Sequence, residues 1–148
     1  MRTVLFVCTH NSSRSQMAEG LLRARYGDRY EVQSAGTKPS GVNSFAVEVM
    51  AEIDIDISDH TSDHVFAYTE GKHDIVVTVC DDAAETCPFI PAQEKNLHRG
   101  FDDPSAVTGP DEEKRAAFRR VRDELAQWID ATFGPDGPTP TQSETTRT

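Results

Sequence analysis

The sequence predicts an α/β fold in which an open, parallel, four-stranded sheet carries helices on both faces, giving three layers. Short runs of branched and aromatic residues, typical of buried strands, alternate with segments whose apolar residues recur every three or four positions, as in helices. The chain contains no internal repeat that would indicate a solenoid. Because strands joined through helices lie parallel, this alternation indicates an open parallel sheet. In such folds ligands bind at the carboxyl ends of the strands.

Four segments are expected to form the strands. The clearest reads DIVVTV, because a nearly continuous apolar run is typical of a strand buried on both faces. A turn-like THNSS stretch separates the first apolar run from a helix-like segment. The expected strands are Thr3–Val7, Tyr30–Ala35, Asp74–Val79 and a shorter one between Asn96 and Phe101.

Three helices are expected between and after these strands. Small and apolar residues recur at helical spacing over Ser15–Tyr26, and again from Ala46 to Ile53. After the Gly109-Pro110 break, large apolar residues from 118 to 129 fall at steps of three and four, with acidic residues in the first turn. This last segment is expected to be the final helix.

The length of 148 residues leaves room for one domain with a proper core. We expect this domain to span residues 1–133. The remaining residues, 134–148, read GPDGPTPTQSETTRT and contain no large apolar side chain. Burial of such a segment cannot offset the conformational entropy lost on ordering, so it is expected to be a disordered polar tail.

The composition excludes several classes of partner. The 25 acidic residues outnumber the 15 basic ones, which gives a formal charge of −10, so nucleic acid and anionic membranes would be repelled. No apolar run approaches the ~20 residues that cross a bilayer, and the N-terminal run is too short for a signal peptide. We therefore expect a cytoplasmic protein, with a monomer as the working expectation. Only four of the basic residues are lysine, and this acid-rich, lysine-poor composition is typical of halophilic proteins.

Cys8 and Arg14 form a Cys-x5-Arg motif between the first expected strand and the first expected helix. Backbone N–H groups of such a loop can surround a tetrahedral oxyanion, the helix N-terminus adds partial positive charge, and a guanidinium can bind two oxygens. The same environment lowers the pKa of a cysteine, so we expect Cys8 to attack as a thiolate, with Ser15 donating to its sulfur. The expected oxyanion loop consists of Thr9, His10, Asn11, Ser12, Ser13, Arg14 and Ser15.

On the motif alone, a buried structural cysteine and a solvated arginine are the alternative. However, CTHNSSRSQMAEG strongly resembles the phosphate-binding loop of low-molecular-weight tyrosine phosphatases and of the arsenate reductases that share their fold. Further segments resemble the thioredoxin-coupled arsenate reductases in the same order, over most of residues 3 to 133. These segments are VQSAG, DIDISDHTSD, DIVVTVC, GFDDP and FRRVRDEL.

The resemblance implies an acid that protonates the leaving group from a DP motif. Asp103, directly before Pro104, matches this acid, and Asp102 is the weaker candidate. A plain turn is the alternative, since Asp-Pro pairs are common in turns. Two loop positions depart from the family pattern: Ser13 stands where many relatives have a second cysteine, and His10 replaces the usual glycine.

Three features favour the reductase branch over the phosphatase branch. Gln16 stands where the phosphatases usually have proline, and Ser105 where they usually have an aromatic residue. Cys80 and Cys87 match the two shuttle cysteines of the reductases. The resemblance implies that Cys8 forms a thiol-arsenate adduct, that Cys80 attacks Cys8 and releases arsenite, and that Cys87 moves the disulfide to Cys80. Thioredoxin or a related thiol then reduces this last disulfide.

A helical segment from Cys80 to Cys87 would separate their Cα atoms by roughly 10 Å, whereas a disulfide needs about 4.4 to 6.8 Å. The segment is therefore expected to rearrange on oxidation. The second-ranked function is a phosphatase that works through a Cys8 phosphoenzyme. The third is a non-catalytic metal or metalloid module using these two cysteines with His73 or His98, although six intervening residues suit zinc poorly.

No tightly bound cofactor is expected. The resemblance implies a potassium site in some reductases, and the matching residues here are Asn11, Glu19, Ser34 and Asp63. Ordinary capping and surface hydrogen bonds are the alternative for these four side chains.

Overall fold

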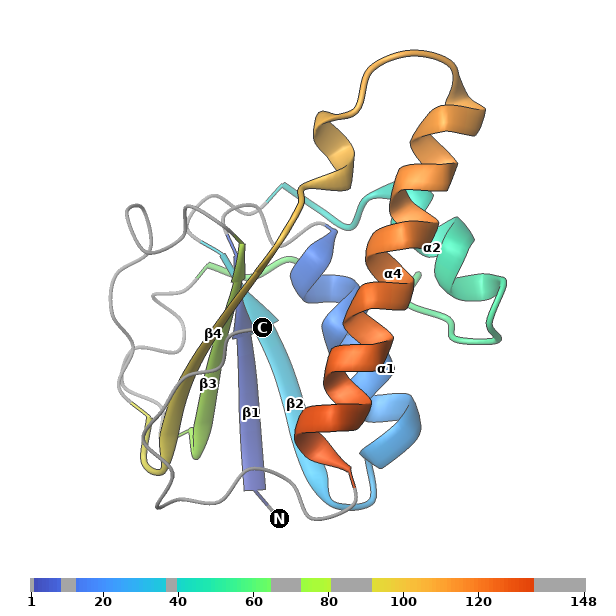
Figure 1. Ribbon diagram of the computed structural model, residues 1–148. Helices are drawn as coiled ribbons and strands as arrows, with labels where there is room; N and C mark the ends of the chain where they lie inside the picture. Colours follow the sequence, from blue (N-terminus) through green and yellow to red (C-terminus); the bar gives the residue numbers. More distant parts are fainter. Residues whose placement is uncertain (1, 9–12, 37–39, 65–72, 81–91, 135–148) are drawn as a thin grey trace.

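Four parallel strands form one sheet in the order β2-β1-β3-β4 (Figure 1). The strands are β1 (Arg2–Val7), β2 (Tyr30–Ala35), β3 (Ile75–Cys80) and β4 (Lys95–Phe101). This computed structural model describes residues 2–8, 13–36, 40–64, 73–80 and 92–134. The predicted parallel, four-stranded sheet is confirmed, and every predicted strand is present with its ends displaced by at most a residue.

The strand register aligns the carboxyl ends at one edge of the sheet. Val7 of β1 lies opposite Ala35 of β2 on one side and Thr78 of β3 on the other. Across the next pair, Cys80 lies opposite Phe101, after an irregularity between Thr78 and Cys80. The segments that follow β1, β3 and β4 therefore leave the sheet at the same edge, where ligands of parallel folds bind.

The helices α1 (Arg14–Tyr26), α2 (Ser44–Ala51) and α4 (Asp111–Phe133) lie on one face of the sheet (Figure 1). The helix α2 begins at an Asn43 cap, whose side chain accepts from the Phe45 N–H at 2.8 Å. The first turn of α4 is acidic, which suits the positive end of the helix dipole. Helices were predicted on both faces, and those in the described residues lie on one. Residues 65–72 and 81–91, which precede and follow β3 in the sequence, lie outside the described chain.

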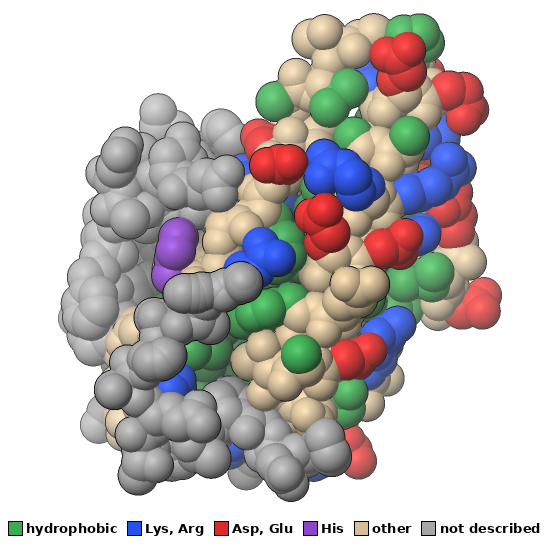
Figure 2. Space-filling model, viewed as in Figure 1, with side chains coloured by type: hydrophobic (Ala, Val, Ile, Leu, Met, Phe, Trp, Pro, Cys, Tyr) green, Lys and Arg blue, Asp and Glu red, His purple; other side chains and the backbone are tan. Residues whose placement is uncertain are grey.

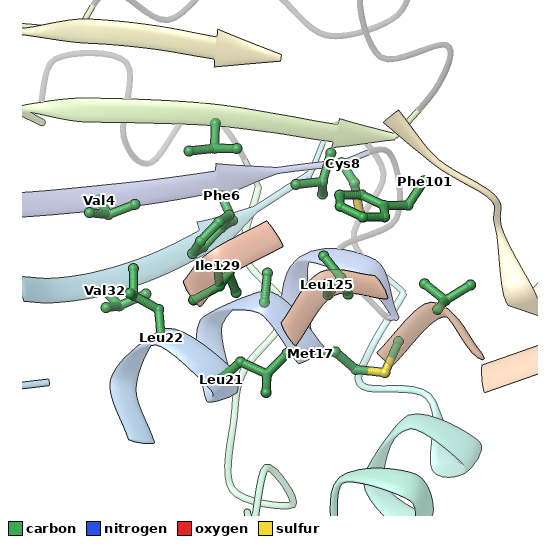
Figure 3. Packing of buried hydrophobic residues seen from close by; sticks show 14 of the residues in the cluster. Val4, Phe6, Cys8, Met17, Leu21, Leu22, Val32, Phe101, Leu125 and Ile129 are labelled. Atoms are coloured by element: carbon green, nitrogen blue, oxygen red, sulfur yellow. The ribbon is translucent and has the colours of Figure 1, made fainter. Parts of the chain in front are cut away.

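Alternation along β1 divides the core into two layers. Val4, Phe6 and Cys8 face the helices, whereas Leu5 and Val7 belong to a smaller buried cluster on the other face. Figure 3 shows Cys8 at one end of the larger cluster, beside Phe101, with Met17 of α1 and Leu125 of α4 nearby. The nucleophile predicted from the sequence thus lies at the margin of the main core.

Ion pairs tie α2 to α4 on the surface. Glu52, at the end of α2, accepts from Arg119 at 2.8 Å and from Arg122 at 2.9 Å. The hydrogen bond from Arg119 is the largest of the effects that lower the pKa of Glu52 to about 2. Figure 2 shows acidic and basic side chains interspersed over this side of the molecule. Among the helices in the described parts of the chain, none is long and apolar enough to cross a membrane.

The last residue of α4, Phe133, has its side chain fully buried and packs edge-on against Phe6, Tyr30 and Trp128. We expect Phe133→Ala to lower the free energy of unfolding by ~3–5 kcal/mol, because truncation of a buried aromatic ring leaves a cavity. Removal of residues 135–148, which lie outside the described chain, should leave it unchanged. Urea unfolding measures both values, and a loss above ~1 kcal/mol on truncation would contradict a domain boundary at 133.

Candidate active site

Cys8 follows β1 directly and is held from two neighbouring elements. Its N–H donates to the carbonyl of Ala35 in β2 at 3.1 Å, and its Sγ lies 3.1 Å from Oγ of Ser15 in the first turn of α1. The Cys8 side chain is almost fully buried. Because the positive end of the α1 dipole and a hydroxyl both lie at the sulfur, this position favours a thiolate.

Arg14 is the first residue of α1 and is buried. Its Nη1 donates to the carbonyl of Phe101 at 3.1 Å, and its Nη2 lies 3.6 Å from Oδ2 of Asp103. Two buried polar atoms, Nε of Arg14 itself and Oγ of the preceding Ser13, have no hydrogen-bond partner among the described residues. Buried donors of this kind are normally satisfied, so they suit an anion bound in the loop. The loop residues Thr9, His10, Asn11 and Ser12 lie outside the described chain.

The two aspartates of the DDP segment have different surroundings. Asp103 caps the short 3₁₀ helix Pro104–Ala106: its Oδ1 accepts from Ser105 N–H at 3.0 Å and from Ser105 Oγ at 2.6 Å, while Oδ2 faces Arg14. Asp102 instead pairs with Arg120 of α4 at 3.3 Å. Asp103 is therefore the aspartate that the fold brings to Arg14, with its side chain still 34% exposed.

Cys80 is the last residue of β3, and Cys87 lies outside the described chain. Because Val7 pairs with Thr78, strand spacing and rise place the Cys8 and Cys80 backbones about 6 Å apart. His73 precedes β3, so it is separated from Cys80 by the length of the strand, about 20 Å. His98 is exposed on β4. The described residues contain no group of three His, Cys, Asp or Glu that could hold a metal, and Cys87, which the metal module would need, lies outside them.

Two of the residues expected to bind potassium are in direct contact. Oγ of Ser34 donates to Oε1 of Glu19 at 2.5 Å, and both residues are buried. Asp63 lies at the same end of β2, where its backbone carbonyl accepts from Gly36 N–H at 2.9 Å. The other carboxylate oxygen of Glu19 accepts from Nη2 of Arg23 at 2.5 Å. Asn11 lies outside the described chain, so potassium binding stays a prediction.

His60 joins this group in a defined protonation state. Its Nε2 lies 3.1 Å from Nη1 of Arg23, and its Nδ1 lies 2.9 Å from Oε1 of Gln16, whose amide nitrogen donates to the Thr61 carbonyl. An arginine can only donate, so Nε2 must accept and Nδ1 must carry the proton. Burial lowers the pKa of His60 and outweighs the nearby Glu19 carboxylate, which acts to raise it. The ring is therefore neutral.

Several of these contacts were not predicted from the sequence. The Arg23–Glu19 ion pair could have been predicted, since opposite charges four residues apart share one face of a helix. The contacts of Arg14 with the Phe101 carbonyl and of Arg23 with the His60 ring could not, because the partners lie 87 and 37 residues apart in the sequence.

Known proteins with similar sequences cover most of this chain. The family described as "Low molecular weight phosphotyrosine protein phosphatase" matches residues 3–133. The arsenate reductase of Halalkalibacterium halodurans is 49% identical over 136 residues, covering 92% of this chain and 97% of that protein. The arsenate reductase of Bacillus subtilis is 48% identical, covering 84% and 89%.

Solved structures from both branches share the fold. "An arsenate reductase in oxidized state" is 31% identical with a TM-score of 0.75, and covers 88% of this chain and 95% of its own. "An arsenate reductase in the phosphate binding state" is 30% identical with a TM-score of 0.71 and the same coverage. A low molecular weight protein tyrosine phosphatase from T. tengcongensis is 26% identical with a TM-score of 0.72, and covers 88% and 96%.

The neutral ring of His60 predicts a loss of stability in acid. Its pKa is lowered on folding, so between the folded value and 6.5 the unfolded chain binds more protons, and stability falls as pH drops through this range. We expect the wild type to lose a few degrees more in Tm than His60→Gln between pH 7.5 and 5.5, at about 2–4 °C per kcal/mol. Equal losses in thermal scans of the two proteins would contradict the assignment.

Proposed function

Because the chain belongs to the low molecular weight phosphotyrosine protein phosphatase family, we propose that it reduces arsenate to arsenite through a relay of thiols. Its curated relatives of nearly full length are named arsenate reductases. The observation that carries the proposal is the pairing of β1 with β3, which brings the backbones of Cys8 and Cys80 to the same edge of the sheet. Hydrolysis of a phosphate ester would need only the first of these two cysteines.

Arsenate binds in the loop that follows β1, with Arg14 as its principal cation. The buried Nε of Arg14 and Oγ of Ser13 are oriented donors that have no described partner. Since Nη1 is held by the Phe101 carbonyl, the remaining guanidinium edge is positioned before the anion arrives. A related structure, solved as an arsenate reductase in the phosphate binding state, supports a tetrahedral oxyanion at this site.

The reaction begins when the Cys8 thiolate attacks arsenic and an oxygen of arsenate leaves as water. Asp103, whose Oδ2 faces Arg14, supplies the proton to the leaving oxygen. The Cys80 thiolate then attacks Sγ of Cys8, and the electron pair of the sulfur–arsenic bond passes to arsenic, which leaves as arsenite. The Cys87 thiolate attacks Cys80, releases the Cys8 thiolate and leaves a Cys80–Cys87 disulfide.

The relay needs a dithiol that returns two electrons to the last disulfide. Thioredoxin or a related thiol fits this requirement, and a reducing cytoplasm is the compartment where such thiols are maintained. The excess of 25 acidic over 15 basic residues, with four lysines, fits a high-salt cytoplasm. A monomer is sufficient for this scheme, because every residue assigned a role comes from one chain.

A phosphatase activity is the second candidate, since water could resolve a Cys8 phosphoenzyme in the same loop. The similarity to the phosphatase of T. tengcongensis favours this candidate. Against it, Ser105 follows the Asp103-Pro104 pair and holds Asp103, in a position where the phosphatase branch provides a ring for an aryl substrate. Arsenate reduction is therefore the principal assignment.

The test of the relay is turnover of the reduced protein with arsenate and a thioredoxin system, followed as NADPH oxidation over a range of salt concentrations. The wild type should turn over many times. Cys87→Ser should stop after about one turnover, because the Cys8–Cys80 disulfide can no longer move to Cys87. No arsenate-dependent oxidation, together with hydrolysis of an aryl phosphate, would make the protein a phosphatase.

Asp103 and Asp102 form a matched pair for testing the acid. Asp103→Asn should lower kcat for arsenate by roughly 10²–10⁴-fold, the usual contribution of a general acid. Asp102→Asn, which removes one of the two carboxylates that pair with Arg120 on α4, should change kcat only a few-fold. The assay is steady-state arsenate reduction at saturating reductant, and equal losses in the two variants would contradict the assignment of Asp103.

A further inference from the structure

A carboxylate lies buried on the first turns of α1, and the chain itself provides a cation for it. Oε2 of Glu19 accepts from Nη2 of Arg23 at 2.5 Å, and Oε1 accepts from Oγ of Ser34 at 2.5 Å. The Glu19 side chain is only 11% exposed, whereas that of Arg23 is 47% exposed. The guanidinium therefore covers the carboxylate on its solvent side.

The position of Glu19 connects it to both supports of the nucleophile. On α1, Ser15, Glu19 and Arg23 follow at steps of four and share one face of the helix. Ser15 is the residue whose hydroxyl contacts Sγ of Cys8. On β2, Ser34 directly precedes Ala35, whose carbonyl accepts from the Cys8 N–H. Through Ser34 and its own helix, Glu19 thus joins the two elements that hold Cys8.

We propose that Arg23 is a positioning residue that acts as the built-in counter-ion of Glu19, so that Cys8 is kept reactive without the potassium ion that the resemblance implies at this carboxylate. A buried carboxylate needs a cation or strong donors, because desolvation penalises its charge. This chain meets the need with a guanidinium that is fixed by two further acceptors, the Val32 carbonyl at 2.6 Å and Nε2 of His60 at 3.1 Å. A cation from solution that took the place of this guanidinium would have to break all three contacts.

Neither His60 nor Arg25, the nearby groups that could carry positive charge, acts as a counter-ion for Glu19. His60 is neutral, as its hydrogen bonds require, and so contributes no positive charge beside Glu19. Arg25, two residues after Arg23 on α1, is paired with Asp130 at 2.7 Å. Among the described residues, Arg23 is therefore the cation that reaches Glu19. The proposal rests on Cys8 being the nucleophile of the proposed function, and it does not require arsenate to be the substrate.

The test follows alkylation of Cys8 by iodoacetamide, located by peptide mass mapping, in choline chloride and in potassium chloride of equal ionic strength. The wild type should react at the same rate in both salts, within about twofold. Arg23→Met should react at least roughly tenfold more slowly in choline chloride, as expected for loss of a hydrogen-bonded charge, and should recover much of the rate in potassium chloride. Arg23→Lys should stay near the wild type in both salts.

The matched control is Arg25→Met, which removes an arginine from the same helix and should leave both rates unchanged. A purely structural role for Arg23 would slow Arg23→Met equally in the two salts and would overturn the proposal. A wild-type rate that rises several-fold in potassium chloride would also overturn it, even if Arg23→Met failed to fold. Arsenate turnover is measured separately, so a failure of the proposed function would be seen without any change in these rates.

Discussion

The guanidinium of Arg14 joins the first loop of the chain to its last strand, and the rest of the site depends on this interaction. Its Nη1 donates to the carbonyl of Phe101 at the end of β4, and its Nη2 faces Asp103 just beyond. Loss of either partner would destabilise the fold, because it would leave a buried charge without compensation. The contact therefore holds the acid-bearing segment against the oxyanion loop, although the two are separated by 87 residues in the sequence.

The parallel sheet provides the second constraint. Because the parallel strands β1, β3 and β4 are neighbours in register, their carboxyl ends lie at one edge of the sheet, where Cys8 follows β1. The same fold can then support two reactions of a covalent Cys8 adduct, which differ in the group that attacks the adduct. In the phosphatase branch water attacks the bound group. In the reduction proposed here a thiol attacks the sulfur, and Cys80 ends β3 at the same edge of the sheet as Cys8.

The charges of this protein are arranged on two scales. Over the whole chain the net charge of −10 repels anions, so an oxyanion must be captured by local donors rather than by long-range attraction. At short range the acidic groups are met by arginines: Arg14 lies beside Asp103, Arg23 covers Glu19, and Arg122 of α4 pairs with Glu52 at the end of α2. The planar guanidinium can satisfy several acceptors at once, which a lysine ammonium does less well.

The sequence by itself determined the alternation of strands and helices and the Cys-x5-Arg loop, since each of these depends on local periodicity or on a short motif. The choice of Asp103 as acid candidate came from the resemblance to the family. Only the tertiary structure decided which carbonyl orients Arg14, which tautomer His60 adopts and which cation reaches Glu19. Those contacts depend on strand register and on the packing of α1 against β2, where a shift of one residue would change every partner. Such long-range geometry arises from the burial of the whole core, and no short segment of the sequence encodes it.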